Sequence, residues 1–221
     1  MLFQKLLETN AKEWDAYLHH DFVKELENGT LKQENFLFYL KQDYIFLINY
    51  AKAFARLALN ANTAKELRFA MKFQNYIVDG ELELHKSILA LGIEADKLSV
   101  KDESFTNIAY TRYVLSVGDS GDFLDMLVAL SACATGYGYI GREIYERLGD
   151  QGLVNHPYKE WILTYAGKEF QAEVKDFEDF VNSYTNAVDE CKFKKLSEIF
   201  NTTTRLETAF WQHALTLQMQ I

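Results

Sequence analysis

Residues 36–57, FLFYLKQDYIFLINYAKAFARL, carry apolar side chains that return every three or four positions, and they contain neither glycine nor proline. Spacings of three, four and seven place such residues on one face of an α-helix, whereas a strand would alternate with a period of two. Nothing in the segment interrupts a helix. The stretch therefore predicts one long amphipathic helix that begins near Phe36 and continues through Leu57.

The same periodicity extends over the rest of the 221-residue chain. The chain has 1 proline and 11 glycines, although average usage of about 5% would supply roughly eleven prolines. Because proline and glycine mark turns and interrupt helices, their scarcity predicts long helices and excludes an all-β sandwich. The periodic segments predict helices over residues 2–28, 64–91, 103–115, 122–148, 168–189 and 193–218, and a short one around Trp161. We expect an all-α fold, a single-domain multi-helix bundle that spans residues 1–221.

Composition indicates which classes of partner and which cellular compartment the chain fits. The 23 basic and 32 acidic side chains give a net charge of −9, which disfavours nucleic acid or an anionic membrane surface as the main partner. The two cysteines, Cys133 and Cys191, are too few for a disulfide framework and fit a reducing compartment. The N-terminus lacks the apolar stretch of a secretory signal. The longest uncharged run, 16 residues between Asp125 and Arg142, is shorter than the ~18–20 apolar residues of a membrane span. We therefore expect a cytoplasmic protein.

Two acidic residues occupy positions where the helical pattern calls for apolar ones. Asp43 lies on the same stripe as Tyr39, and Glu207 precedes Phe210 at helical spacing. A carboxylate among aromatic side chains is costly unless it is paired or used in function. Simpler explanations stay open: Asp43 at the edge of its stripe, in contact with solvent or a lysine, and Glu207 solvated near Arg205.

One cysteine lies in an unusual helical segment, ALSACATGYGY (129–139). Cys133 precedes Tyr137 by four positions, so the thiol and the phenol are neighbours on one helix face. Gly136 and Gly138 each destabilise a helix by about 1 kcal/mol relative to alanine. We therefore expect another helix or a ligand to approach closely at these glycines. The alternative for a lone cysteine in an apolar helix is a buried, inert side chain.

Aromatic side chains accompany these polar residues. Tyr110, Tyr113, Tyr137 and Tyr165 are candidates for a pocket wall, although a buried tyrosine is most often a core residue whose hydroxyl is bonded by a neighbour. Aromatic walls with a few convergent polar groups are typical of a pocket for a small flat ring. The residues by themselves indicate only a helical bundle whose aromatic interior holds two carboxylates and one cysteine.

Metal and cofactor motifs fit the sequence poorly. Glu81 and His85 are four positions apart and could reach one ion, but a di-iron bundle needs two Glu-x-x-His elements and further glutamates. The five histidines do not supply that pattern. No Gly-rich phosphate loop, dinucleotide fingerprint, paired-cysteine motif or basic recognition helix is present. We expect no metal, no organic cofactor and no nucleic-acid partner.

Five segments carry a family resemblance that covers essentially the whole chain. In chain order they are FYLKQDY (38–44), AYT (109–111), the segment of Cys133 and Tyr137, HPYKEWI (156–162) with Tyr165, and ETAFW (207–211). Each is weak alone, but their order and spacing resemble the TenA/thiaminase II family, aminopyrimidine hydrolases with a haem-oxygenase-like helical fold. Many members have proline where this chain has Ala132, and some have tyrosine where it has Phe46.

The resemblance implies roles for eight residues. It makes Cys133 the catalytic nucleophile and Glu207 the acid/base near the pyrimidine ring nitrogen. It makes Asp43 the carboxylate that holds the exocyclic amine and the adjacent ring nitrogen. The remaining substrate-binding residues would supply hydroxyls (Tyr110 and Tyr165) or aromatic walls (Phe46, Tyr137 and Phe210). Glu81 and His85 match a recurrent family pair, to which we assign no role.

The implied reaction is a hydrolysis in thiamin salvage. An aminopyrimidine aminohydrolase would convert 4-amino-5-aminomethyl-2-methylpyrimidine, or thiamin as a second substrate, to 4-amino-5-hydroxymethyl-2-methylpyrimidine, without a cofactor. The sequence does not rank the two substrates. The resemblance also implies a homotetramer. Two alternatives stay open: a non-catalytic pyrimidine-binding or regulatory protein on the same fold, and a haem-oxygenase-like metal oxidase, which the small number of histidines disfavours.

Overall fold

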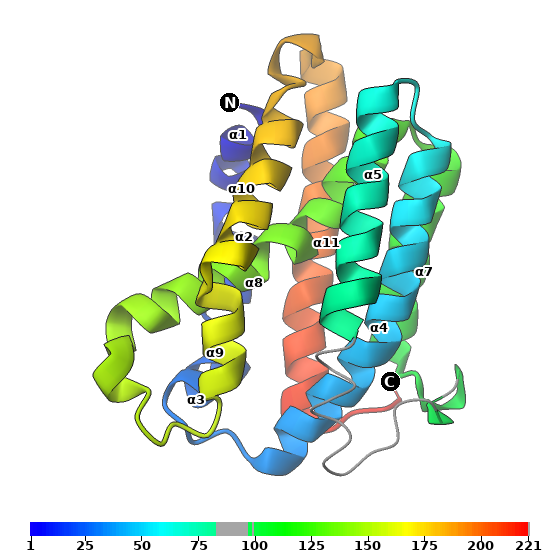
Figure 1. The fold of residues 1–221 in the computed structure, drawn as a ribbon. Helices are drawn as coiled ribbons and strands as arrows, with labels where there is room; N and C mark the ends of the chain where they lie inside the picture. Colours follow the sequence, from blue (N-terminus) through cyan, green and yellow to red (C-terminus); the bar gives the residue numbers. More distant parts are fainter. Residues whose placement is uncertain (83–96, 99, 221) are drawn as a thin grey trace. The chain divides into compact units, whose positions relative to one another are not determined.

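A computed structural model describes residues 1–82, 97–98 and 100–220 of the chain (Figure 1). In these residues every regular element is a helix, which confirms the all-α fold. The chain divides into two compact units, which we describe separately. Unit 1 comprises Met1–Leu31 and Val128–Trp211, and unit 2 comprises Lys32–Leu127 and Gln212–Ile221. The single domain over residues 1–221 stays a prediction.

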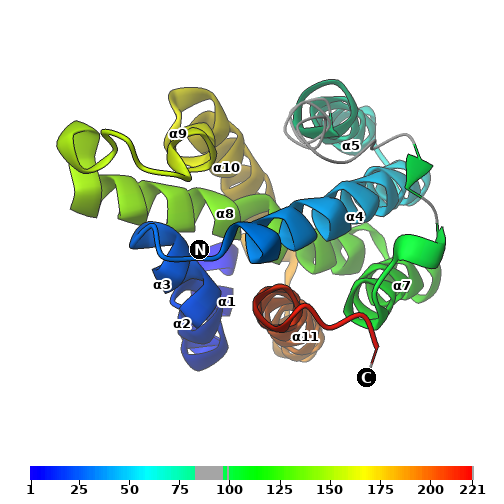
Figure 2. The ribbon, with the colours of Figure 1, turned by 90° about the horizontal axis from the view of Figure 1, so that it is seen from below.

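The long helix expected from residues 36–57 is present in unit 2. It is α4 (Gln33–Leu59), and it is followed by α5 (Ala64–Tyr76), which continues as the π-helical turn η1 (Ile77–Glu81). The N-terminus of α5 has a capping box, in which the Thr63 hydroxyl accepts from the Glu66 amide and the Glu66 carboxylate accepts from the Thr63 amide. α4 and α5 lie side by side in Figures 1 and 2. The predicted continuation to residue 91 lies outside the described residues.

The other elements of unit 2 pack next to α4. They are the short helix η3 (Val100–Asp102) and α7 (Phe105–Ser120), which contacts α4 along its length. The Ser104 hydroxyl caps α7 by accepting from the Asn107 amide. The predicted end of this helix near residue 115 was wrong, since α7 continues through Gly118. A Cβ on Gly118 would lie 2.2 Å from the Met126 sulfur, so the glycine lets that side chain pack closely on this part of the helix.

The predicted N-terminal helix over residues 2–28 was wrong, because unit 1 begins with three short helices. They are α1 (Leu2–Thr9), α2 (Ala11–Leu18) and α3 (Asp21–Glu27). At the first break the Asn10 side chain turns back to the Leu6 carbonyl and to the Ser197 hydroxyl. At the second, His20 accepts from the Phe22 amide as an N-cap. Side chains that bond the backbone locally compete with a continuous helix.

Two long helices take part in both units, α8 (Phe123–Gly152) and α11 (Glu190–Thr216). Unit 1 also contains α9 (Lys159–Ala166), α10 (Lys168–Asn182) and the short helix η4 (Thr185–Ala187). α10 ends at Asn182, seven residues before its predicted end. There the side chain of Asn182 accepts from the Phe3 amide, so a contact with α1 accompanies the end of the helix.

α8 is the core helix of unit 1. A Cβ on Gly136 would lie 2.2 Å from the Tyr17 ring, and a Cβ on Gly141 would lie 2.6 Å from that of Tyr165. A Cβ on Gly138 would lie 2.6 Å from Cγ2 of Val174 on α10. Close approach of other helices was predicted at Gly136 and Gly138, and the neighbours there are α2 and α10; the neighbour of Gly141 is Tyr165, on α9. Among the described residues, α8 alone is long and apolar enough to cross a membrane, but 89% of that apolar stretch is buried in the protein. Such burial is typical of a core helix.

Candidate functional site

The eight candidate residues divide between the two units. Asp43, Phe46 and Tyr110 belong to unit 2, and the other five belong to unit 1, namely Cys133, Tyr137, Tyr165, Glu207 and Phe210. All but Cys133 are buried.

Asp43 is a buried acid on α4. Its side chain is 4% exposed, and its Oδ2 accepts a hydrogen bond of 3.1 Å from the Tyr39 hydroxyl, one helical turn earlier. The alternative of a solvent-facing aspartate is therefore wrong. The neighbouring lysine, Lys41, pairs with Asp102 at 3.1 Å instead. A buried carboxyl group is costly unless it is hydrogen-bonded, and the Tyr39 hydroxyl supplies one such bond.

The other two unit 2 candidates meet where α4 packs on α7. The Phe46 ring lies 4.9 Å from the Tyr110 ring and 5.3 Å from the Tyr50 ring, measured between centroids. Phe46 and Tyr50 are stacked, whereas Phe46 and Tyr110 are tilted. Aromatic pairs at these distances stabilise each other by about 0.5–1.5 kcal/mol beyond the area they bury. The Phe46 ring is thus packed against one aromatic ring from its own helix and one from α7.

A polar clamp, which the sequence analysis missed, fixes α4 against α7. The Gln42 amide oxygen accepts from the Ser104 amide at 2.9 Å, and the Asn107 side chain donates to the Gln42 backbone carbonyl at 2.8 Å. Gln42 also donates to the Asp102 carbonyl at 2.7 Å. All three side chains, Gln42, Ser104 and Asn107, are fully buried. The clamp bonds the residue directly before Asp43, so it fixes the part of α4 from which that carboxylate projects.

The unit 1 candidates centre on α8. Cys133 is half-buried, so the residue is less enclosed than a core cysteine. Tyr137, one turn later, is buried and lies in an aromatic cluster. Its ring centroid is 5.1 Å from that of Tyr165, 5.3 Å from that of Trp211 and 6.2 Å from that of Trp161. Two predicted wall residues, Tyr137 and Tyr165, are therefore in direct ring contact.

Trp211 extends this cluster toward the N-terminal helices. Its indole stacks on Phe22 at 4.9 Å and on Tyr17 at 6.2 Å. Tyr17 in turn fills the space left by the missing side chain of Gly136. Trp211 was singled out only as part of the motif at 207–211, and no role was predicted for Tyr17 or Phe22. Their signal was weak, because each is one of many aromatic residues in the chain.

Glu207 and Phe210 lie on α11 and are each 2% exposed. The alternative of a solvated Glu207 near Arg205 is therefore wrong: Arg205 is exposed, whereas Glu207 points to the interior. Glu207 precedes Trp211 by four positions, so the carboxylate lies on the helix face that carries the indole. A buried glutamate in aromatic surroundings is a candidate for proton transfer.

The pair Glu81 and His85 cannot be located, since His85 and the side chain of Glu81 lie outside the described residues. Within the described ranges, no group of three or more His, Cys, Asp or Glu side chains could hold a metal ion.

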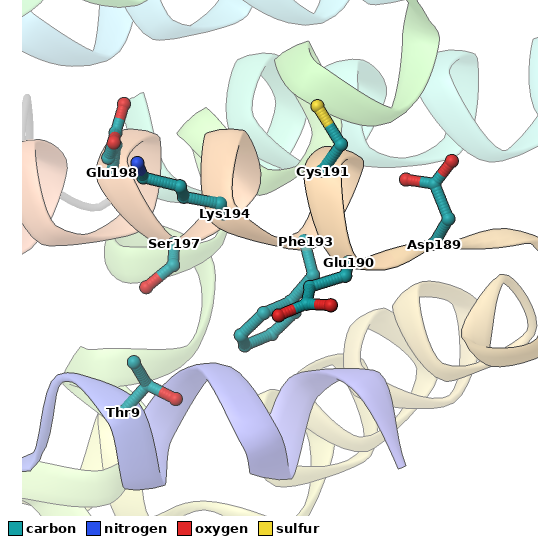
Figure 3. A pocket seen from close by; sticks show the side chains of 8 residues that line it. All are labelled: Thr9, Asp189, Glu190, Cys191, Phe193, Lys194, Ser197 and Glu198. Atoms are coloured by element: carbon teal, nitrogen blue, oxygen red, sulfur yellow. The ribbon is translucent and has the colours of Figure 1, made fainter.

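The second cysteine lies at a different place in unit 1. Cys191 is exposed and borders an open surface pocket between α1 and the start of α11 (Figure 3). Phe193 and Ser197 extend toward the helix that carries Thr9, whereas the Cys191 sulfur extends away from it (Figure 3). None of the eight candidate residues lines this pocket. Cys191 is therefore a natural control for experiments on Cys133.

The helical architecture defines the class of protein. The chain superposes on the crystal structure of a TenA family transcription regulator from Silicibacter sp. TM1040 with a TM-score of 0.86 and 35% identity, over 98% of this chain and 97% of the other. A domain from Shewanella denitrificans with a haem-oxygenase-like fold superposes with a TM-score of 0.75 at 14% identity, over 97% and 92% of the two chains. The fold is therefore haem-oxygenase-like.

The family follows from the sequence comparison. The model of the TENA/THI-4/PQQC family matches residues 9–217, and the chain belongs to this family. An uncharacterized protein of Haemophilus influenzae is 34% identical over 217 residues, which cover 98% of this chain and all of the relative. An aminopyrimidine aminohydrolase of Halalkalibacterium halodurans is 34% identical over 208 residues, 93% of this chain and 92% of the relative.

Proposed function

We propose that this protein is an aminopyrimidine aminohydrolase that hydrolyses 4-amino-5-aminomethyl-2-methylpyrimidine, and thiamin as a second substrate, to 4-amino-5-hydroxymethyl-2-methylpyrimidine. One observation carries the proposal: Cys133 is half-buried one turn from Tyr137, whose ring belongs to a buried aromatic cluster. The aminohydrolase name of the Halalkalibacterium halodurans relative supports it.

In the proposed reaction, Glu207 donates a proton to a pyrimidine ring nitrogen, which makes the neighbouring ring carbon electrophilic. The Cys133 thiolate adds to that carbon and forms a C–S bond, and the ring loses its aromaticity. The electron pair then expels the substituent from the exocyclic methylene, as ammonia or as the thiazole of thiamin. Water adds to the methylene, the C–S bond breaks, and the ring regains its aromaticity. The net reaction of the aminomethyl substrate consumes one water and releases one ammonia.

Asp43 would select the aminopyrimidine. A carboxylate accepts hydrogen bonds from an exocyclic amine and from a protonated ring nitrogen, but it repels the oxygen of an oxo analogue. The hydrogen bond from Tyr39 fixes the direction of the Asp43 Oδ2 atom. Phe46, Tyr137 and Phe210 would stack on or enclose the flat ring, and the Tyr110 and Tyr165 hydroxyls would bond its polar edges.

The proposal extends to the setting of the enzyme. It acts in thiamin salvage in the cytoplasm, assembles as a homotetramer and uses no metal or organic cofactor. A second candidate is a non-catalytic pyrimidine-binding regulator, which the regulator name of the Silicibacter structure favours. The net charge of −9 weighs against the DNA contact that a transcriptional regulator needs.

The test is a mass-spectrometric assay for the hydroxymethylpyrimidine product, with thiamin and the aminomethylpyrimidine offered separately. Wild-type protein and Cys191→Ser are expected to form product, and Cys133→Ser is expected to lose turnover while it still binds the pyrimidine. Folded wild-type protein that binds the ring but forms no product would support the regulator instead. Turnover retained in Cys133→Ser would exclude the thiol as the nucleophile.

A further inference from the structure

One amide side chain in unit 1 joins three helices. Gln171, in the first turn of α10, donates two hydrogen bonds of 2.8 Å from its Nε2 atom, one to the Gly138 carbonyl of α8 and one to the Tyr165 carbonyl of α9. A side-chain amide nitrogen carries two hydrogens, so these bonds use its full donor capacity. Because both acceptors are carbonyl oxygens, the nitrogen end of the amide has to face them.

The two carbonyls differ in what else they can bond. Tyr165 belongs to the last turn of α9, and a helix leaves its last four carbonyls without partners of its own. Gly138 lies inside α8, where a carbonyl that accepts a helical hydrogen bond still has a second lone pair. The Gln171 amide therefore completes the C-terminal end of α9 and ties it to the middle of α8.

The missing side chain of Gly138 makes room for this amide. A Cβ on Gly138 would lie 3.2 Å from Nε2 of Gln171 and 3.3 Å from the Phe170 ring, in addition to its clash with Val174. Three side chains of α10 thus gather over one glycine of α8. This approach accounts for a residue that destabilises the interior of a helix by about 1 kcal/mol relative to alanine.

The bonded carbonyls belong to the backbone around two candidate site residues. Gly138 directly follows Tyr137, and the other carbonyl is that of Tyr165 itself. The two tyrosine rings lie 5.1 Å apart, and the Tyr165 ring lies 4.8 Å from that of Phe170, the residue before Gln171. Since the backbone sets the direction in which a side chain leaves a helix, a bond that fixes both backbones also fixes how the two rings meet.

We propose that Gln171 is a positioning residue for Tyr165: its amide sets the place of α9 against α8, and thereby the place of the Tyr165 hydroxyl in the substrate site. The inference rests on the proposed function, which assigns that hydroxyl to the polar edge of the pyrimidine. Gln171 acts only through the backbone of other residues. A displacement of about 1 Å in a site can lower a rate by about 10²-fold, so such a support is functionally important.

The position of Tyr165 can be measured without substrate, by fluorine NMR of protein that contains fluorotyrosine. Tyr165→Phe assigns the resonance. Gln171→Met keeps the length of the side chain and loses both donors, whereas Gln171→Glu turns a carboxylate oxygen toward two carbonyl oxygens. We expect the Tyr165 resonance to shift in Gln171→Met and to shift further in Gln171→Glu.

Tyr139→Phe is the matched control. The Tyr139 hydroxyl donates to Glu178 at 2.8 Å, so this variant also loses a hydrogen bond between α8 and α10, but not one to the Tyr165 carbonyl. Its Tyr165 resonance is expected to stay in place. Circular dichroism checks that every variant is folded. An unmoved resonance in folded Gln171→Met and Gln171→Glu would overturn the proposal.

A double-mutant cycle tests the link to the reaction. We expect kcat/KM for the aminomethylpyrimidine to fall about tenfold in Gln171→Met. In the Tyr165→Phe background the same substitution is expected to lower it by less than about twofold, because the hydroxyl that it misplaces is already absent. Effects that simply multiply would give Gln171 a general structural role and refute the positioning of Tyr165. Inactive wild-type protein would refute the proposed function alone, since the fluorine resonance tests Gln171 without turnover.

Discussion

The Tyr39 hydroxyl donates a hydrogen bond of 3.1 Å to Oδ2 of Asp43, and both side chains are buried on α4. The two residues are one helical turn apart on the same helix. The bond therefore depends on the geometry of α4 alone, and small movements of other helices do not break it. The phenol compensates part of the cost of burying the carboxylate and fixes the direction of one of its oxygens. Tyr39 is therefore a positioning residue for the proposed amine-binding group.

Tyr39→Phe removes this hydroxyl and keeps the ring. We expect the free energy of unfolding to fall by about 1–2 kcal/mol, because a buried carboxylate loses a donor. We expect KM for the aminopyrimidine to rise about three- to tenfold with kcat little changed, as for a loss of uniform binding. Tyr44→Phe, a half-buried tyrosine on the same helix, is the control. An unchanged KM in folded Tyr39→Phe, together with weaker binding in Asp43→Ala, would assign recognition to Asp43 without Tyr39.

Glu207→Gln tests the proposed proton donor. The amide cannot transfer the proton, so kcat is expected to fall by about 10²- to 10⁴-fold. The binding of the product pyrimidine, measured by calorimetry, is expected to change much less. Glu198→Gln lies on the same helix, borders the pocket of Figure 3, and is expected to leave kcat unchanged. A wild-type rate in Glu207→Gln would remove the acid/base role.

Gly136→Ala tests the close approach of Tyr17 to α8. The new methyl would lie 2.2 Å from the Tyr17 ring, which must therefore move. We expect the free energy of unfolding to fall by about 1–3 kcal/mol, the usual effect of overpacking a core. Nothing lies within 4 Å of the corresponding position on Gly80, so Gly80→Ala is expected to be neutral or slightly stabilising. Urea denaturation of both variants gives the comparison.

Tyr139 should make the protein sensitive to alkaline pH. Burial and the hydrogen bond to Glu178 raise the pKa of the Tyr139 phenol well above its ordinary value of 10.0. The contribution of the neutral phenol to the free energy of unfolding is therefore present in full below about pH 10. It is lost progressively as the pH rises further, because the phenol of the unfolded chain ionises first. We expect the difference in unfolding free energy between wild type and Tyr139→Phe to stay constant from pH 7 to about 9 and to shrink above about pH 10. A difference that stays constant to pH 11 would contradict this.

Local patterns predicted much of the helical structure. The period of apolar residues and the scarcity of proline predicted α4, α8 and α11 closely, because these helices form wherever one face can be buried. The predicted helix boundaries were wrong where a side chain hydrogen-bonds the backbone of its own segment or of another helix. Asn10 and His20 divide the first predicted helix into three, and both are ordinary polar residues in the sequence.

At the candidate site, too, the sequence predicted the unusual residues but not their neighbours. Sequence alone singled out Asp43, Glu207 and Cys133, since a polar residue on an apolar stripe is visible from spacing, and the family resemblance assigned roles to them. Their surroundings depended on long-range partners. Gln42 and Asn107 are 65 positions apart in the chain and yet form one clamp, and Tyr137 meets Trp211 across a comparable distance in sequence.

The amino-acid sequence by itself therefore determined that the chain is helical, which family it resembles and which residues are chemically unusual, because each of these depends on residue type and on spacing within one helix. Tertiary structure decided that Asp43 and Glu207 are buried, that Cys133 is only half-buried, and which rings surround Tyr137. Burial and ring contacts depend on which helix packs against which, and a helical period carries no information about the identity of its neighbour.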